Sequence, residues 1–429
     1  MDFLNSEAGA QQLDRDDLLA SFRNKFCIPK AGDQEVTYFL GNSLGLQPTS
    51  TAHHIEAVLK QWQQLGVEGF FKGNQPWLSY HDLLAKPLAT IVGALPHEVV
   101  VMNQLTVNLH LMLVSFYRPQ GKRTKILCEA KAFPSDQYML ETHLRHLGFD
   151  PAEHLIEVLP KPGKVLIEQD AILNAIEKHK DEIALVLWGG VNYYTGQLFD
   201  MQQITEAAQK IGALVGFDLA HAAGNVPLQL HDWNVDFACW CSYKYLNAGP
   251  GAVGGVYIHE RNHKVENLNR FAGWWGYKKE TRFQMQQGFQ PILSAEGWAL
   301  STPSPLLFAT HFAALEIFAE ANVRAIFEKS DRLSGFLFFV LGEVLKKFKH
   351  PAFLILTPTD SKSRGSQVSL LFQQNGKAVF ETLTANHIFA DWREPDVIRI
   401  APVPLYNTYF EVWHFGAVLE KALQESGAQ

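Results

Sequence analysis

The sequence predicts an α/β fold, with a mainly parallel central sheet covered by helices on both faces and a smaller α+β domain at the C-terminus. Two observations lead to this prediction. In the middle of the 429-residue chain, short continuous apolar segments alternate with helix-like segments, which is typical of buried parallel strands joined by helices. In residues 306–429, long helical patterns and short strands are mixed instead.

The elements of the larger domain are expected in alternating order. A strand-like piece at 99–101 leads into a helix over 107–116. The next strands cover 125–128, 183–188, 213–218, 235–243 and 254–258, and the helices between them cover 135–147 and 200–211. Sheets of this type bind ligands at the carboxyl ends of their strands, so residues that follow a strand are the first candidates for a site.

The C-terminal region is expected to begin with two long helices. Its helices cover 304–319, 322–349 and 377–384, its strands cover 353–356, 367–372 and 397–400, and a last helix starts at Tyr409. A chain of this length exceeds one compact core. We therefore expect three parts, namely an N-terminal segment (1–45) that packs with the small domain, a large domain (46–305) and a small C-terminal domain (306–429).

Composition and charge argue against several classes of protein. The net charge is −7 and no basic run occurs, which disfavours nucleic acid as a partner. Residues 1–19 are polar and acidic, unlike a signal peptide, and no apolar run reaches the length of a membrane span. We expect a cytoplasmic protein. The cysteines lack metal-site spacing, so no metal is expected and each should be a small buried residue: Cys27, Cys128, Cys239 and Cys241.

Lys244 is the most informative single residue. It ends the apolar run 235–243 and precedes a Gly/Pro loop, with no acidic neighbour to pair with. A lysine amine removed from water is nucleophilic and bonds covalently to carbonyl compounds, above all pyridoxal 5'-phosphate (PLP). The alternative is a lysine whose amine reaches out to solvent at a strand end, and this segment alone leaves both open.

Asp218 and His221 follow the preceding predicted strand. In a PLP enzyme, a carboxylate at this place pairs with the pyridine nitrogen and keeps it protonated. Because Asp218 ends the strand before the one that leads to Lys244, both side chains would lie at the same edge of the sheet. A carboxylate that caps the next turn is the alternative for Asp218.

Two segments offer hydroxyl groups that are suited to a phosphate. Thr106 stands where a strand turns into a helix, and Ser242 and Tyr243 directly precede the lysine. Phe133 is a candidate to stack on a planar ring. An ordinary N-cap at Thr106 and a plain turn at 133–136 are the alternatives.

Arg399 lies inside the short apolar strand 397–400. A buried arginine is costly unless it is paired. A bidentate clamp on a substrate carboxylate is one solution, and an internal salt bridge is the other.

With these residues together, the sequence resembles the kynureninase family, PLP enzymes of the fold type I (aspartate aminotransferase) superfamily. The resemblance runs through nearly the whole chain and is carried by the segments 40–48, 105–110, 133–136, 194–197, 216–222, 231–233, 236–249, 273–276 and 399–406. The Asp-x-x-His pair is common to the superfamily, whereas the run around Lys244 and the block from Arg399 to Tyr406 are far more specific. A PLP-dependent hydrolase is implied, as a homodimer with active sites at the subunit interface.

The resemblance also assigns roles to single residues. Lys244 matches the lysine that bonds to PLP, Asp218 the partner of the pyridine nitrogen, and Tyr243 a phosphate ligand that is also the candidate proton donor. Arg399 matches the arginine that binds the substrate's α-carboxylate. The other cofactor positions are Leu105, Thr106, Phe133, Pro134, Ser135, Asp136, His221, and, reaching across the dimer interface, Trp274 and Thr302. Two further substrate positions are Ser43 and Phe70.

The implied reaction is hydrolysis of L-kynurenine to anthranilate and L-alanine, in tryptophan catabolism or NAD precursor supply. Phe70 and Thr302 stand where animal members place a histidine and an asparagine, and Gly189 stands where some members carry Ser or Thr. These departures favour kynurenine as the substrate, with 3-hydroxykynurenine as a second candidate.

Other functions remain to be weighed. A cysteine desulfurase needs a mobile catalytic cysteine in a late loop, yet all four cysteines precede Ser242. An aminotransferase would release a keto acid. A non-catalytic PLP-fold protein that acts as a ligand sensor or scaffold is less consistent with Lys244, Asp218 and Arg399 occurring together.

Overall fold

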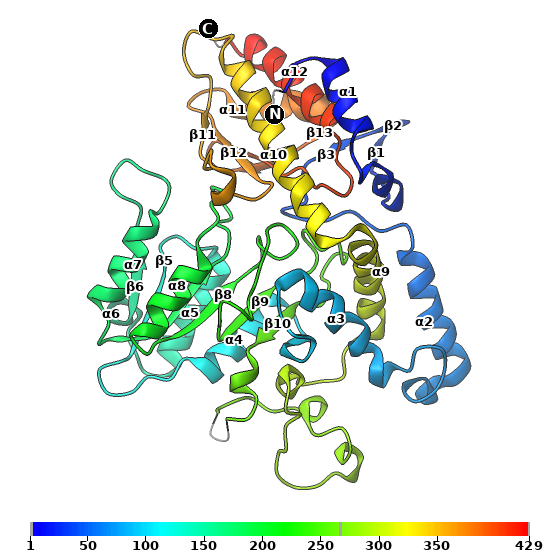
Figure 1. The fold of residues 1–429 in the computed structure, drawn as a ribbon, viewed down its shortest axis with the longest axis vertical. Helices are drawn as coiled ribbons and strands as arrows, with labels where there is room; N and C mark the ends of the chain where they lie inside the picture. Colours follow the sequence, from blue (N-terminus) through cyan, green and yellow to red (C-terminus); the bar gives the residue numbers. More distant parts are fainter. Residues whose placement is uncertain (1–2, 266–267, 428–429) are drawn as a thin grey trace.

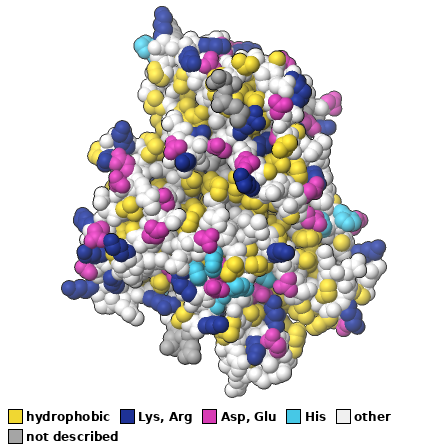
Figure 2. Space-filling model, in the orientation of Figure 1, with side chains coloured by type: hydrophobic (Ala, Val, Ile, Leu, Met, Phe, Trp, Pro, Cys, Tyr) yellow, Lys and Arg dark blue, Asp and Glu magenta, His cyan; other side chains and the backbone are white. Residues whose placement is uncertain are grey.

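A computed structural model describes residues 3–265 and 268–427 of the chain. In Figure 1 these residues form two bodies, a larger one below that contains the main sheet and a smaller one above it. The N-terminal helix, blue, lies in the upper body beside the red C-terminal helix. Figure 2 shows acidic and basic side chains interspersed over the same face of the molecule.

The main sheet has seven strands in the order β4-β10-β9-β8-β7-β5-β6. Their bounds are β4 Val99–Val101, β5 Lys125–Glu129, β6 Leu155–Val158, β7 Ile183–Gly189, β8 Leu214–Asp218, β9 Phe237–Trp240 and β10 Gly255–Ile258. β10 pairs antiparallel with both of its neighbours, β4 and β9, and the other described pairings of this sheet are parallel. The predicted α/β fold with a mainly parallel sheet is confirmed.

Helices cover both faces of the sheet because successive side chains of a strand point to opposite sides. In β7, Leu185 and Leu187 share a buried cluster with side chains of α4 and α5, whereas Val186 and Trp188 share another with α7 and α8. The helices of the larger body are α2 Thr51–Leu65, α3 Tyr80–Val92, α4 Leu105–Phe116, α5 Pro134–His146, α6 Pro151–His154, α7 Gln169–Lys178, α8 Met201–Lys210 and α9 Pro305–Ala321. Burial on both faces explains why the strands read as continuous apolar runs.

The smaller body contains a four-stranded antiparallel sheet in the order β11-β12-β15-β14. The bounds are β11 Leu354–Ile355, β12 Val368–Leu371, β14 Asp391–Arg393 and β15 Val397–Ile400, with helices α10 Val323–Leu345, α11 Gly376–Ala385 and α12 Tyr409–Glu425. Short elements complete the chain: β1 Lys30–Ala31, β2 Gln34–Glu35, β3 Thr37–Tyr38, β13 Ile388–Phe389 and the 3₁₀ helices η1 Ala20–Lys25, η2 Gly66–Phe70, η3 Trp77–Ser79, η4 Pro96–Glu98, η5 Glu260–Asn262, η6 Trp274–Gly276, η7 Arg282–Gln284, η8 Ala295–Trp298 and η9 Ser361–Ser363.

The N-terminal segment packs on the smaller body. Helix α1 (Glu7–Arg15) contacts α12, and β3 pairs in parallel with β13. The carboxylate of Asp14 accepts hydrogen bonds from the backbone N–H groups of Tyr409 and Phe410 at the start of α12. Asp17 and Lys329 form a buried ion pair at 2.7 Å. An acid at a helix start is favourable because the first N–H groups of a helix lack intrahelical partners.

Helix α9 connects the two bodies. It packs on α2 and α3, and α10 continues from it at an angle of 83° into the smaller body. No single helix of the described chain is both long and apolar enough to cross a membrane, although α9 and α10 pass that test of length and composition as a bent pair. The boundaries expected at residues 45 and 305 stay a prediction.

Some predicted element ends and one predicted burial are wrong. The strand expected over 235–243 ends at Trp240, the last residue of β9 that pairs with β10, so Lys244 lies in the loop beyond it. Helix α4 begins at Leu105 rather than at 107. Of the four cysteines expected to be buried, Cys27 is exposed, because it lies in a surface connection after η1.

His311 of α9 predicts a pH-dependent loss of stability. The side chain is fully buried, neither ring nitrogen has a hydrogen-bond partner in the described structure, and burial lowers its pKa to about 3. Below pH 6.5 the unfolded chain gains a proton here that the folded chain does not, so His311 costs about 2 kcal/mol at pH 5. We expect His311→Leu to stabilise the protein more at pH 5 than at pH 7.5 in urea unfolding. An equal effect at both pH values would contradict this.

Candidate active site

A cavity of about 410 Å³ opens where the smaller body faces the carboxyl ends of β5, β7, β8 and β9. Such strand ends are where sheets of this class bind ligands. The residues that line it are Asn42, Ser43, Gln104, Leu105, Thr106, Glu129, Ala132, Phe133, Ser135, Asp136, Gly189, Val191, Tyr193, Asp218, Ala220, His221, Tyr243, Lys244, Arg393 and Arg399. The cavity therefore brings together eleven of the fifteen residues that the sequence singled out.

Lys244 is held by a histidine. Its Nζ lies 3.0 Å from Nε2 of His221. Burial and the nearby Lys244 charge lower the pKa of His221 well below its usual value, so the imidazole is neutral and Nε2 accepts a hydrogen bond from the amine. The other ring nitrogen, Nδ1, is buried without a partner among the described residues. Nζ also lies 6.0 Å from the centre of the Phe133 ring.

Two carboxyl groups meet beside the lysine. Asp218 ends β8, and its Oδ1 accepts a hydrogen bond from the backbone N–H of Ala220 at 2.7 Å. Burial and the neighbouring Asp218 raise the pKa of Asp136 well above its usual value, and the two side chains are hydrogen-bonded. Burial also raises the pKa of Asp218, but the hydrogen bonds from Asp136 and from the Ala220 N–H and the nearby Lys244 oppose this rise. Because two adjacent buried carboxylates cannot both ionise readily, Asp136 is the one that keeps its proton, and its O–H donates a hydrogen bond to the Asp218 carboxylate.

Two helix starts converge at the other end of the cavity. Helix α4 begins at Leu105 and α5 begins at Pro134, and the two helices pack together. The hydroxyl oxygens of Thr106 and Ser135 lie 3.4 Å apart. Free N–H groups, the positive ends of two helix dipoles and two hydroxyls make this end an anion site.

Arg399 keeps two donors for a ligand. Its Nε lies 2.6 Å and its Nη2 2.5 Å from Oδ2 of Asp391, and its Nη1 donates to the backbone carbonyl of Tyr193 at 2.6 Å. A guanidinium has five N–H groups. Nη1 uses one of its two, and the buried Nη2 has no hydrogen-bond partner among the described residues, so at least one N–H remains on each terminal nitrogen. The two alternatives left open by the sequence are thus compatible, because an internal salt bridge still leaves a pair of donors of the kind that binds a carboxylate.

Tyr243 presents a protonated phenol to the cavity. Burial, with Cys241 and Asp218 nearby, raises the pKa of its hydroxyl above its usual value. The group is therefore a hydrogen-bond donor at neutral pH and is able to give a proton to a more basic oxygen or carbon.

Four predicted residues lie outside this cavity. Pro134 is exposed at the first position of α5, and the ring of Phe70 packs edge-on against Trp77 at 5.2 Å. Trp274 and Thr302 lie exposed in the segment between β10 and α9. The roles assigned to these residues stay predictions, and those of Trp274 and Thr302 require a second chain.

Sequence reasoning missed several lining residues, among them Glu129, Tyr193 and Arg393. Glu129 ends β5 as Asp218 ends β8, so the same signal, an acid that closes an apolar strand, would have found it. Tyr193 contributes through its backbone carbonyl. Because every residue has this group, the residue type gives no signal in the sequence.

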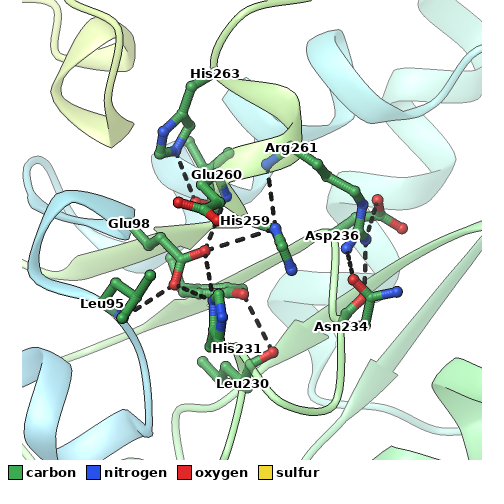
Figure 3. Close-up of polar contacts among 12 residues, drawn as sticks. Leu95, Glu98, Leu230, His231, Asn234, Asp236, His259, Glu260, Arg261 and His263 are labelled. Atoms are coloured by element: carbon green, nitrogen blue, oxygen red, sulfur yellow. Dashed lines mark hydrogen bonds and ion pairs between the residues drawn. The ribbon is translucent and has the colours of Figure 1, made fainter.

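A second polar cluster lies outside the cavity, around Glu98 just before β4 and His259 just after β10 (Figure 3). Ligand-type atoms of Glu98, His231 and His259 lie within 4.8 Å of one another. The buried carboxylate of Glu98 already accepts hydrogen bonds from the backbone N–H groups of Leu95 and Glu260 and from Nδ1 of His231. These bonds tie η4 to the segments that flank β9 and β10. The expectation that the chain binds no metal stays a prediction.

Comparisons with known proteins point to the same chemistry as the cavity. A model of the kynureninase C-terminal domain matches residues 326–419. Kynureninase from Flavobacterium johnsoniae is 50% identical over 99% of this chain and 99% of its own length. Kynureninase from Stenotrophomonas maltophilia is 51% identical over 97% of this chain and 98% of its own length.

Solved structures with a TM-score of 0.75 support the fold. One is a lysine-to-alanine mutant of C-DES with glycine covalently linked to the PLP cofactor, 20% identical over 93% of this chain and 98% of that chain. Another is an apo cysteine desulfurase from Thermococcus onnurineus NA1, 17% identical over 91% of this chain and 95% of that chain. At these identities the likeness shows a fold type I architecture, whereas the full-length relatives at half identity show that this chain belongs to the kynureninase family.

Proposed function

We propose that this chain is a PLP-dependent hydrolase that converts L-kynurenine to anthranilate and L-alanine at the cavity around Lys244. The observation that carries the proposal is the grouping of a lysine, a charged strand-end aspartate, an anion site and an arginine with two free donors in one cavity. These are the groups needed to bind PLP, which is a phosphorylated pyridine aldehyde, together with an α-amino acid.

The cavity fits PLP. The phosphate would bind at the anion site of Thr106 and Ser135, the ring against Phe133, and the pyridine nitrogen at Asp218. Buried polar atoms without partners in the described chain, His221 Nδ1 and Ser43 Oγ, indicate that a polar ligand completes the site. When bound, PLP supplies an electron sink for the α-carbon of the substrate.

The side chains then have separate tasks. Arg399 binds the α-carboxylate and so fixes which bond of the α-carbon faces Lys244. The Lys244 amine takes the α-proton and returns a proton later in the cycle, and neutral His221 holds that amine between transfers. Water adds to the γ-carbonyl, the β–γ carbon bond breaks, anthranilate leaves, and the remaining three-carbon unit gains a proton to become alanine. The Tyr243 phenol would donate a proton to the carbonyl oxygen or to that carbon.

The finer assignments follow from the family and from exposed side chains. We infer a homodimer, because Phe71, Trp274, Phe283 and Met285 are exposed apolar residues. The ring of Phe283 contacts the rings of both Phe71 and Trp274. Phe70 and Thr302 would meet the substrate ring in this dimer and favour kynurenine over 3-hydroxykynurenine. We also infer a cytoplasmic enzyme of tryptophan catabolism or NAD precursor supply.

Anthranilate fluorescence tests the function directly. The protein loaded with PLP is expected to release anthranilate and alanine in equal amounts from L-kynurenine, with a higher kcat/KM than for 3-hydroxykynurenine. It should release no sulfide from cysteine, because no cysteine lines the cavity in the part of the chain that the structure describes. Release of a keto acid in place of alanine would instead indicate an aminotransferase. Absence of anthranilate in the presence of bound PLP would overturn the proposal.

A further inference from the structure

The loop that follows β7, residues 192–197, joins the two bodies at the cavity. Three successive backbone carbonyls of this loop accept hydrogen bonds from side chains of the smaller body. The carbonyl of Tyr193 accepts from Arg399 at 2.6 Å and from Gln367 at 3.0 Å. The next two accept from Ser369 and Thr357, each at 2.6 Å. The position of the Arg399 guanidinium therefore depends on the position of this loop.

Asn192 organises the loop from within. Its Oδ1 accepts hydrogen bonds from the backbone N–H groups of Tyr194 at 2.9 Å and Thr195 at 2.7 Å, and from the hydroxyl of Thr195 at 3.0 Å. Its Nδ2 points the other way and donates to Oε1 of Glu129 at 2.5 Å. Asn192 thus links the shape of the loop to a side chain at the end of β5.

Glu129 is a rigid anchor for that link. The side chain is only 4% exposed and stands beside the end of β7, where a Cβ added to Gly189 would lie 3.2 Å from Oε2. Burial raises its pKa to about 7, so the group carries little charge next to Asp218 below that pH. Among the described residues, the side-chain hydrogen bond of this carboxyl is the one that it accepts from Asn192.

We propose that Glu129 and Asn192 are positioning residues for Arg399. They fix the loop whose Tyr193 carbonyl holds the guanidinium, and so they set the affinity of the cavity for the α-carboxylate of the substrate. The inference rests on the proposed function for the identity of that substrate. The effect on the reaction is indirect, through Arg399.

Asn192→Ala in the PLP-loaded enzyme tests the inference. We expect KM for kynurenine to rise about tenfold or more, since a hydrogen bond to a charged group is lost or weakened, while kcat changes less than about threefold. Binding of L-alanine, followed by the absorbance of the holoenzyme, should weaken by a similar factor. Binding of the amine that remains when the α-carboxylate of kynurenine is removed should stay unchanged. A general folding defect would weaken both ligands.

Three more variants separate a loss of loop positioning from a general folding defect. Glu129→Ala is expected to repeat the effect and carries the test if Asn192→Ala does not fold. Glu129→Gln keeps an acceptor oxygen for Asn192 and should restore a KM close to that of the wild type. Asn386→Ala, which removes a surface asparagine of the smaller body, is the control and should change nothing. Two results would overturn the inference. One is unchanged affinity for L-alanine in both Asn192→Ala and Glu129→Ala, and the other is an equal loss of affinity for L-alanine and for the amine that lacks the α-carboxylate.

The two proposals fail in different ways. A wild-type holoenzyme that produces no anthranilate would overturn the proposed function, yet the alanine-binding arm would still decide the role of Asn192. A wild-type enzyme that hydrolyses kynurenine normally, together with an Asn192→Ala variant of unchanged KM, would overturn only the positioning role.

Discussion

Lys244→Ala is expected to lower kcat for kynurenine hydrolysis by about 10,000-fold, the largest effect of any single change in the chain. The amine has two tasks, since it bonds to PLP and also moves the α-proton. PLP should still bind through the anion site at Thr106 and Ser135, because those groups do not depend on the lysine. Anthranilate fluorescence at saturating kynurenine and PLP measures the loss.

A matched variant controls for the loss of a lysine in general. Lys164→Ala removes an exposed lysine from a loop between β6 and α7 and should leave kcat unchanged. Turnover in Lys244→Ala within tenfold of the wild type would show that another group moves the α-proton.

Arg399→Ala is expected to have the second largest effect, a fall in kcat/KM of about 1,000-fold. Two charge-assisted hydrogen bonds to the α-carboxylate are lost, and with them the orientation of the α-carbon toward Lys244. Arg399→Lys should recover only part of the activity, because an ammonium group supplies the charge without the paired donors. Steady-state kinetics with kynurenine measure both variants.

The structural cost of these changes needs its own control. Removing Arg399 leaves the carboxylate of Asp391 with Arg393, 3.0 Å away, as its remaining partner. The double variant Arg399→Ala, Asp391→Asn removes this carboxylate as well and should not regain activity. Recovery of kcat/KM in the double variant would contradict the role of Arg399 as the carboxylate ligand.

The sheet and one side of the cavity were predictable because they follow from local patterns. Continuous apolar runs predicted the strands, and an acid that closes such a run, Asp218, predicted a functional strand end. Lys244 was found for the same reason, although it lies in the loop after β9 rather than on the strand. Its partner His221 follows the preceding predicted strand, so the order of the strands along the chain was enough to predict that His221 and Lys244 lie close together.

The other side of the cavity was not predictable because its contacts join distant parts of the chain. Arg399 meets the backbone of Tyr193 across 206 positions in sequence. Its salt bridge to Asp391 comes from an adjacent antiparallel strand, whose pairing a single sequence does not specify. Phe70, Trp274 and Thr302 lie outside the cavity, so their assigned roles stay predictions, and those of Trp274 and Thr302 rest on the proposed dimer.

The most direct test of the account is to find which residue bonds to PLP. Borohydride reduction of the holoenzyme fixes that bond, and mass analysis of the digested protein then locates the added pyridoxyl phosphate group. We predict that the group is found on the peptide that contains Lys244, in the wild-type protein and in Lys164→Ala, and is absent from Lys244→Ala. Modification of a different lysine, or retention of the same label in Lys244→Ala, would contradict the central claim.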